Sequence, residues 1–300
     1  MIRAISRNGL WAWMHRKEQA RNRLRRIRNT VKEYRSLQRR NPPRAPAERL
    51  AWPVGRQAGA AQRPFAVFDI DGTLIRWQLY HAVADSLVKL GYIAPVKYQA
   101  IKDARMIWKR RESTESYKQY ELKLVELYSQ ILSEITVQQF ENAAQAVFDE
   151  YKDQIYTYTR DLVAKLRKEG YLLFAISGSQ EQIIAKMADY YGFNDFSARV
   201  DEQKGGRFTG ISKTPIFHKD ETLKELASKH NATFGDSIGV GDSATDIKML
   251  ELVENPIAFN PESVLFEHAK QEGWKIVVER KNVIYELERG GDKYELVKTN

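Results

Sequence analysis

The sequence predicts an α/β fold: a doubly wound, mostly parallel sheet with a helical segment inserted after its first strand. Two observations support this prediction. From residue 64 onward, short β-rich apolar runs alternate with stretches of helical periodicity, which is typical of a parallel sheet covered by helices on both faces. Between the first two of these runs, residues 78–155 show helical periodicity alone. We therefore expect one sheet interrupted by a helical insertion.

The first strand, 65–70, is apolar and β-rich, and it ends in an Asp-Gly-Thr turn. Glycine and lysine residues around Gly205 and Gly206 predict a β-hairpin over 199–209. The other expected strands are 172–176, 237–241, 257–259 and 275–278. The expected helices are 161–168, 180–191, 219–230 and 245–253.

The insertion reads as a helical bundle. Tyr117, Tyr120, Leu124, Leu127 and Ile131 recur at helical spacing and predict one apolar face. Phe140, Ala144 and Val147 predict a second face. We interpret Trp77, Trp108 and the tyrosines of this block as core residues.

Residues 1–63 differ from the rest of the chain. They hold 15 arginines, 2 lysines and 3 glutamates, a formal charge of +14, and the whole chain carries +9, which leaves −5 for residues 64–300. The sequence predicts a basic, disordered extension that ends in a linker rich in proline, alanine and glycine. Contact with nucleic acid, contact with an anionic membrane surface and a targeting role all remain open for it.

Two absences exclude whole classes of function. The chain has no cysteine, which rules out disulfides, thiolate metal sites and a cysteine nucleophile. No apolar run approaches the roughly 18 residues of a membrane-spanning helix. This composition fits a cytoplasmic protein, and it leaves the oligomeric state open.

Reactive side chains stand at the predicted ends of strands and starts of helices, where ligands bind in open α/β sheets. Asp69 and Asp71 follow the first strand, and Lys219 opens a helix. The remaining candidates are Ser177, Gly178, Asp242 and Asp246. A carboxylate in such a group can attack phosphorus. Carboxylate and phosphate repel each other, so a cation is needed, and ligands that are all oxygens suit Mg²⁺.

Four segments carry a family resemblance: Phe-Asp-Ile-Asp-Gly-Thr-Leu, Ile-Ser-Gly-Ser, Lys-Asp-Glu-Thr-Leu and Val-Gly-Asp-Ser-Ala-Thr-Asp. Their key residues are separated by 108, 42 and 23 positions. In order and spacing they resemble the four motifs of the haloacid dehalogenase superfamily. The helical insertion resembles the cap of its phosphoserine-phosphatase-like subgroup.

The resemblance implies a role for each matched residue. Asp69 would be the nucleophile and a Mg²⁺ ligand, and Asp71 the general acid/base, with its backbone carbonyl on the metal. Asp242 would bind the metal directly, and Asp246 would support the site without contacting the metal or would reach it through a water molecule. Thr73 would orient Asp71.

Ser177, Gly178 and Lys219 would bind the phosphoryl group. Lys213 and Lys224 compete with Lys219 for the lysine position, and the start of a helix favours Lys219. The domains expected from this resemblance are a core at 64–77 plus 156–290, a cap at 78–155 and a C-terminal tail at 291–300.

We therefore predict a Mg²⁺-dependent phosphomonoesterase that acts on a small phosphorylated metabolite. A phosphotransferase on the same fold, or a binding role for residues 1–63, are the alternatives. The subgroup's glutamate after the first motif is replaced here by Arg76-Trp77-Gln78, which argues against phosphoserine. Arg76 and the basic residues of 105–111 offer partners to an anionic leaving group, although a solvated helix face is the simpler interpretation of 105–111.

Overall fold

The computed structural model describes residues 62–110 and 116–299, so the predicted extension at 1–61 lies outside the described residues. Within that part of the chain, the strands form a single nine-stranded sheet in the order β4-β3-β2-β1-β5-β6-β7-β8-β9. The strands are β1 Arg63–Phe68, β2 Leu172–Gln180, β3 Asp195–Lys204, β4 Arg207–Lys213, β5 Ala232–Gly241, β6 Asn255–Phe259, β7 Lys275–Arg280, β8 Val283–Gly290 and β9 Lys293–Thr299.

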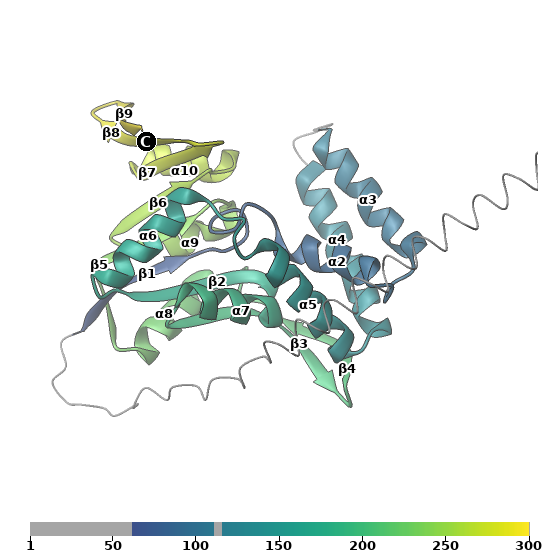
Figure 1. Cartoon of the computed structure of the whole chain (residues 1–300). Helices are drawn as coiled ribbons and strands as arrows, with labels where there is room; N and C mark the ends of the chain where they lie inside the picture. The colour runs from purple at the N-terminus through teal and green to yellow at the C-terminus, as the bar shows by residue number, and fades with distance from the viewer. Residues whose placement is uncertain (1–61, 111–115, 300) are drawn as a thin grey trace, which may run out of the picture. The chain divides into compact units, whose positions relative to one another are not determined.

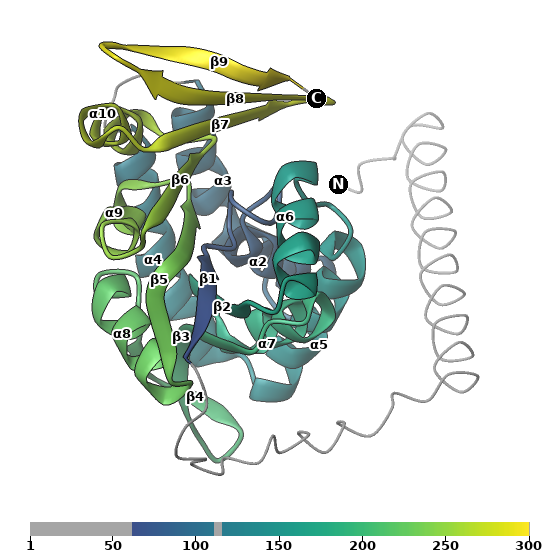
Figure 2. The same cartoon turned by 90° about the vertical axis from the view of Figure 1, so that its left-hand side faces the viewer.

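β1 occupies the middle of the sheet (Figure 2). It pairs in parallel with β2, where Phe65 lies opposite Leu172, and with β5, where Ala66 lies opposite Ile238. β3, β6 and β7 continue the parallel part, while β4, β8 and β9 are antiparallel additions at the two edges. The predicted mostly parallel, doubly wound sheet is confirmed.

Helices cover both faces of the sheet (Figure 2). They are α2 Leu79–Lys89, α3 Pro95–Lys109, α4 Ser116–Glu134, α5 Val137–Tyr151, α6 Thr157–Lys168, α7 Glu181–Tyr191, α8 Lys219–Lys229, α9 Ile247–Leu250 and α10 Ser263–Glu272, with a 3₁₀ turn at Ala244–Asp246. Alternate residues of β1 point to opposite faces. Phe65 and Val67 pack with α8, α9 and α10, whereas Ala66 and Phe68 belong to the core shared with α6 and α7.

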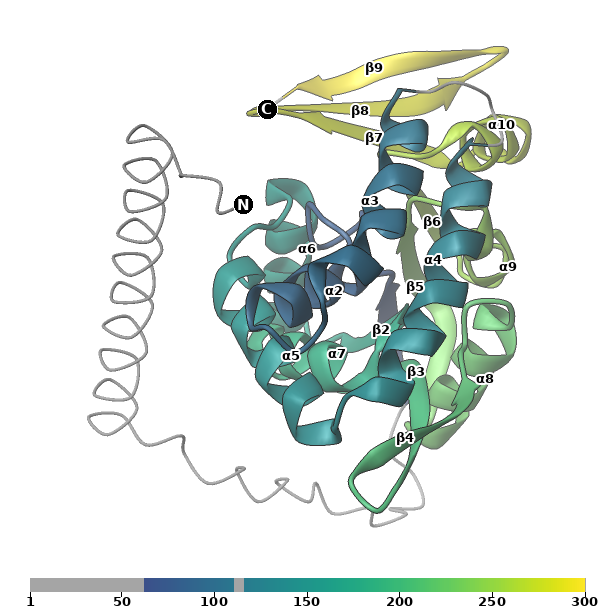
Figure 3. The same ribbon diagram turned by 90° about the vertical axis from the view of Figure 1, so that its right-hand side faces the viewer.

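The insertion after β1 consists of α2 to α5, as predicted (Figure 1). Figure 3 shows α3 and α4 side by side. Tyr120, Leu124 and Ile131 are buried on α4, and Phe140, Ala144 and Val147 are buried on α5, which confirms both predicted faces as far as they are described. The side chains of Tyr117 and Leu127 lie outside the described set.

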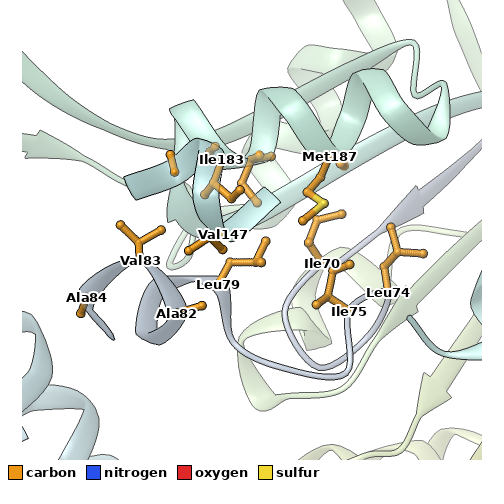
Figure 4. Close-up of a cluster of buried hydrophobic side chains, with 14 of the residues drawn as sticks. Ile70, Leu74, Ile75, Leu79, Ala82, Val83, Ala84, Val147, Ile183 and Met187 are labelled. Atoms are coloured by element: carbon orange, nitrogen blue, oxygen red, sulfur yellow. The ribbon is translucent and has the colours of Figure 1, made fainter. Parts of the chain in front are cut away.

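One buried cluster joins the insertion to the sheet domain (Figure 4). Ile70 and Leu74, in the loop after β1, and Leu79 on α2 lie close to Val147 of α5 and Met187 of α7. All five side chains are 2% exposed or less. The loop that carries the first motif is therefore held between the inserted helices and the sheet.

The C-terminal region differs from the prediction. The segment expected to be a tail at 291–300 contains β9, which pairs with β8, and α10 was not expected. β8 and β9 are rich in charged residues because only one of their faces is covered: Leu287 and Tyr294 pack against the core. Gly290-Gly291 supplied a hairpin signal, and Gly291 has the positive φ of +65° that such a turn requires.

Candidate active site

The four predicted motifs meet at the carboxyl ends of the central strands. Asp69 follows β1 directly, and its backbone N–H donates to the carbonyl of Val240 on β5, 2.9 Å away. Asp242 follows β5, and Ser177 lies near the end of β2. Because β2, β1 and β5 are neighbours in the sheet, their ends bring these side chains together.

Lys219 is the lysine that enters the site. It is the first residue of α8 and only 2% exposed, whereas Lys213 and Lys224 are exposed. Its Nζ lies 2.6 Å from Oδ1 of Asp69 and 2.6 Å from Oδ1 of Asp246. One ammonium group thus links the carboxylates of two different motifs.

Asp71 is held by donors on both of its oxygens. The backbone N–H of Leu79 donates to Oδ1 at 2.5 Å, and the hydroxyl of Ser177 donates to Oδ2 at 2.8 Å. The Ser177 hydroxyl in turn accepts the N–H of Ser179 at 3.0 Å. Thr73, which we expected to orient Asp71, instead donates to Oδ1 of Asp242 at 3.5 Å.

Asp246 organises the loop after β5. Its Oδ2 accepts the backbone N–H of Asp242 at 3.1 Å, and both the N–H and the hydroxyl of Ser243 at 3.0 Å. With Lys219 on Oδ1, both oxygens of Asp246 are engaged, and its side chain is fully buried. Asp246 therefore connects the loop after β5 to Lys219 on α8.

Glycine is required at position 72 for two reasons. Its φ is +88°, in the left-handed region, and a Cβ there would stand 2.2 Å from Oδ2 of Asp242. Gly178 also tolerates no side chain without movement, because a Cβ would meet Cδ1 of Ile216 at 2.9 Å. Gly72 therefore lets the backbone approach the Asp242 carboxylate closely, and Gly178 lets it approach Ile216.

The site carries more negative than positive charge, and the pKa values reflect this. Burial raises the pKa of Asp69 from 3.8 to about 7. Lys219 acts to lower this pKa, and the like charges of Asp246 and Asp71 act to raise it. Burial, with the charge of Asp69, raises the pKa of Asp242 well above its ordinary value. Burial also raises the pKa of Asp71, against the effect of the bonds that it accepts. Although burial opposes it, Asp246 and Asp69 raise the pKa of Lys219.

The residues present fit a divalent cation. One carboxylate oxygen from each of Asp69, Asp242 and Asp246 lies within 4.8 Å of the others. The donors are all oxygens, which suits Mg²⁺. Burial first, and then the like charges of neighbouring carboxylates, raise the pKa values of Asp69 and Asp242, and a cation beside them would stabilise their ionised forms.

Three contributors to the site were missed from the sequence. Ser179 is the last residue of the second motif, next to the predicted site residues Ser177 and Gly178, but the motif predicts no role for Ser179 itself. The Leu79 amide is a backbone group, and the hydroxyl of Thr159, fully buried on α6, donates to the carbonyl of Thr73 at 3.0 Å. Neither of the last two has a sequence signal, because each depends on how the insertion returns to the sheet.

Comparison with known proteins identifies the family. Residues 66–251, more than half of the chain, match the model of the haloacid dehalogenase-like hydrolases. The chain belongs to this family. The predicted family is thus confirmed. The predicted enzyme class, a phosphoric monoester hydrolase, is confirmed by phosphatases among the similar proteins.

A histidinol-phosphatase of Neisseria meningitidis is 26% identical over 71% of this chain and 97% of its own length. The phosphoserine phosphatase SerB1 of Mycobacterium tuberculosis is 28% identical, but the match spans 43% of this chain and 44% of that protein. A solved structure, a phospho-aspartyl intermediate analogue of phosphoserine phosphatase, has a TM-score of 0.54 at 21% identity, and the match covers 74% of this chain and 96% of that one. That likeness supports the fold of this haloacid dehalogenase-like hydrolase.

Two of the arginines considered for an anionic leaving group are engaged elsewhere in this hydrolase. The Arg76 guanidinium donates from Nε to the carbonyl of Ile155 at 2.7 Å and pairs with the buried carboxylate of Glu279. Arg105 pairs with Asp85 at 3.3 Å. Arg111 lies outside the described residues.

Among the helices that the structure describes, none is long and apolar enough to cross a membrane.

Proposed function

We propose that this hydrolase is a Mg²⁺-dependent phosphomonoesterase that acts on a small phosphorylated metabolite, with Asp69 as nucleophile. The observation that carries the proposal is the group of Asp69, Asp71, Asp242 and Asp246, two of them buried and two partly buried, around the ammonium of Lys219. Such an excess of buried carboxylate suits a site that binds a cation together with a phosphoryl group.

Asp69 and Asp71 differ in a way that separates their roles. Both oxygens of Asp71 accept hydrogen bonds, and its raised pKa favours the protonated form that a general acid needs. Asp69 is held by Lys219 through Oδ1, which leaves Oδ2 for attack on phosphorus. As Asp69 forms a bond to phosphorus, the bond to the alcohol oxygen breaks and Asp71 gives that oxygen its proton.

The second step returns the enzyme to its starting state. Asp71, now ionised, removes a proton from water, and the water oxygen attacks phosphorus and displaces the Asp69 carboxylate. Lys219, the Ser177 hydroxyl and the Gly178 amide would offset charge on the phosphoryl oxygens in both steps. The phosphotransferase alternative differs only in that an alcohol takes the place of water.

Asp69, Asp242 and the backbone carbonyl of Asp71 would hold Mg²⁺, and Asp246 would position Asp242 through its backbone amide. When bound, the ion supplies positive charge that offsets repulsion between the carboxylates and the phosphate. Thr73 would orient Asp242, the residue that its hydroxyl contacts.

The test is phosphate release from a panel of phosphomonoesters that includes an aryl phosphate, with and without Mg²⁺. Asp69→Asn should abolish release, and Asp242→Asn should raise the Mg²⁺ concentration needed for half-maximal activity. Asp161→Asn changes an exposed aspartate and is the matched control. Full activity of Asp69→Asn would refute the mechanism. Added alcohols that capture the phosphoryl group would show transfer in place of hydrolysis.

A further inference from the structure

Buried polar atoms without hydrogen-bond partners gather beside the site, on the side of Asp71. Within the described residues, such atoms are the indole N–H of Trp77, the hydroxyls of Tyr80 and Tyr128, Nε of Arg105, both amide atoms of Gln180, and Nε2 of His268. His268 lies apart, next to Trp274 and Glu251. An unpartnered buried polar group costs free energy, so the concentration of the others in one region needs an explanation.

Contacts place these groups around one another. The rings of Tyr80 and Tyr128 have centroids 4.0 Å apart, and Trp77 makes an edge contact with His81. Gln180 lies opposite Arg199 in the β2–β3 ladder, so both side chains face the same side of the sheet. Burial raises the pKa of the Tyr128 phenol, and the Arg199 charge counteracts this, which places Arg199 near that hydroxyl.

The cluster adjoins the group that would protonate the leaving oxygen. Tyr80 directly follows Leu79, whose N–H donates to Asp71, and Gln180 directly follows Ser179, whose N–H donates to the Ser177 hydroxyl that itself bonds Asp71. Tyr80 and Gln180 are therefore each next in the chain to a residue that contacts Asp71 directly or through Ser177. An alcohol leaving from phosphorus toward Asp71 would move toward this cluster.

Two arginines in this region are already paired within the protein, and the Nζ of the exposed Lys109 lies 5.8 Å from the centroid of the Trp77 ring. Arg199 donates to Asp201 through Nε and Nη2 at 3.0 and 2.8 Å, and Arg105 pairs with Asp85. Burial lowers the pKa of His81 to about 3, so its imidazole is neutral at pH 7. The unpartnered phenols and the Gln180 amide both donate and accept, as alcohol hydroxyl groups do.

Resting on the proposed function, we propose that Trp77, Tyr80, Tyr128 and Gln180 select the leaving group, and that they favour an uncharged polyhydroxylated alcohol such as a sugar or polyol. The substrate class is then a sugar or polyol phosphate, not an amino-acid phosphate. These atoms are shielded from solvent, so a leaving group reaches them only after the side chains that cover them move.

The test compares kcat/KM for glycerol phosphate, glucose phosphate, phosphoserine and p-nitrophenyl phosphate in the full chain with Mg²⁺. Wild type should prefer one of the two polyhydroxylated esters over phosphoserine by at least about tenfold. Tyr128→Phe and Gln180→Met should lower kcat/KM for that ester by roughly 5- to 30-fold, and that for the aryl phosphate by less than about twofold. Tyr294→Phe removes a partnered hydroxyl on β9 and should leave the ranking unchanged.

A second readout separates substrate selection from a structural role. Removing an unpartnered buried hydroxyl should leave the Tm of the substrate-free Tyr128→Phe protein unchanged or raised, whereas Tyr294→Phe should lower its Tm. A wild-type preference for phosphoserine, or an equal loss with all esters in both variants, would overturn the inference while aryl phosphate turnover still supports the phosphatase. If wild type hydrolyses no ester at all, the proposed function fails and this inference fails with it.

Discussion

Replacing the nucleophile should change how the stability of the metal-free protein depends on pH. The carboxyl group of Asp69 has a pKa of about 7 in the folded protein, against 3.8 for an unperturbed carboxyl group. The folded state therefore binds this proton more tightly than the unfolded state does. The contribution to stability is fully present below about pH 3.8 and is lost as the pH rises through about 7.

The size of the effect follows from the two pKa values. The difference between 3.8 and about 7, at 1.36 kcal/mol for each pH unit, corresponds to about 4 kcal/mol in the free energy of unfolding. Roughly 2–3 kcal/mol of this is lost between pH 5 and pH 8. Asp69→Asn removes the titrating group, and it also removes one of the charges that raise the pKa of Asp242. The variant should therefore lose less stability than wild type over this range.

The assay is urea unfolding at several pH values from 5 to 8.5 in the presence of a chelator. Near pH 5 the two proteins should have similar free energies of unfolding, and at pH 8 the variant should be the more stable by about 2 kcal/mol. Adding Mg²⁺ should raise the stability of wild type more than that of the variant. Parallel stability curves for the two proteins would refute the charge balance described for this site.

Three further changes test other parts of the structure. Lys219→Met leaves buried carboxylates without their counter-charge, so the free energy of unfolding at neutral pH should fall by about 3–5 kcal/mol. Phosphate release should also be lost. A Lys219→Met protein as stable as wild type would contradict the buried ion pairs. Gly72→Ala should cost about 1–3 kcal/mol in backbone strain and raise the Mg²⁺ requirement by displacing Asp242, as a metal titration would show. Arg76→Met should destabilise the fold by about 1–3 kcal/mol, because Glu279 loses its guanidinium partner but keeps the backbone N–H groups of Thr157 and Tyr158, with kcat/KM for an aryl phosphate within about twofold of wild type. A large loss of turnover in Arg76→Met without loss of stability would instead place Arg76 in the site.

Much of the site was predictable because its residues occupy places that the sequence marks. Asp69 and Asp242 follow apolar runs, and Lys219 stands at a helix start, so the order of strands and helices was enough to bring them together. The partner of Thr73 was not predictable, since hydroxyl direction depends on how the loop after β1 folds against the loop after β5. Arg76 could not be assigned either, because Glu279 is 203 residues away.

The fold was predictable in its parallel centre and less so at its edges. The buried central strands read as apolar runs, whereas β8 and β9 alternate charged and apolar residues and resemble exposed loops. Trp77 and the tyrosines of the insertion were interpreted as core. Tyr128 is indeed buried, but hydrophobic periodicity does not report whether a buried hydroxyl finds a partner, and here it does not among the described residues.

The central place of β1 has a consequence for biosynthesis. Phe65 pairs with Leu172, 107 residues later, and Ala66 with Ile238, 172 residues later. At about 5–20 residues per second, roughly ten to thirty seconds pass between the translation of β1 and that of β5. The contiguous helices α2 to α5 can form local contacts during this interval, while the apolar strand β1 remains unpaired. Chaperone binding to the nascent chain should therefore be concentrated on β1 until β2 and β5 have emerged from the ribosome.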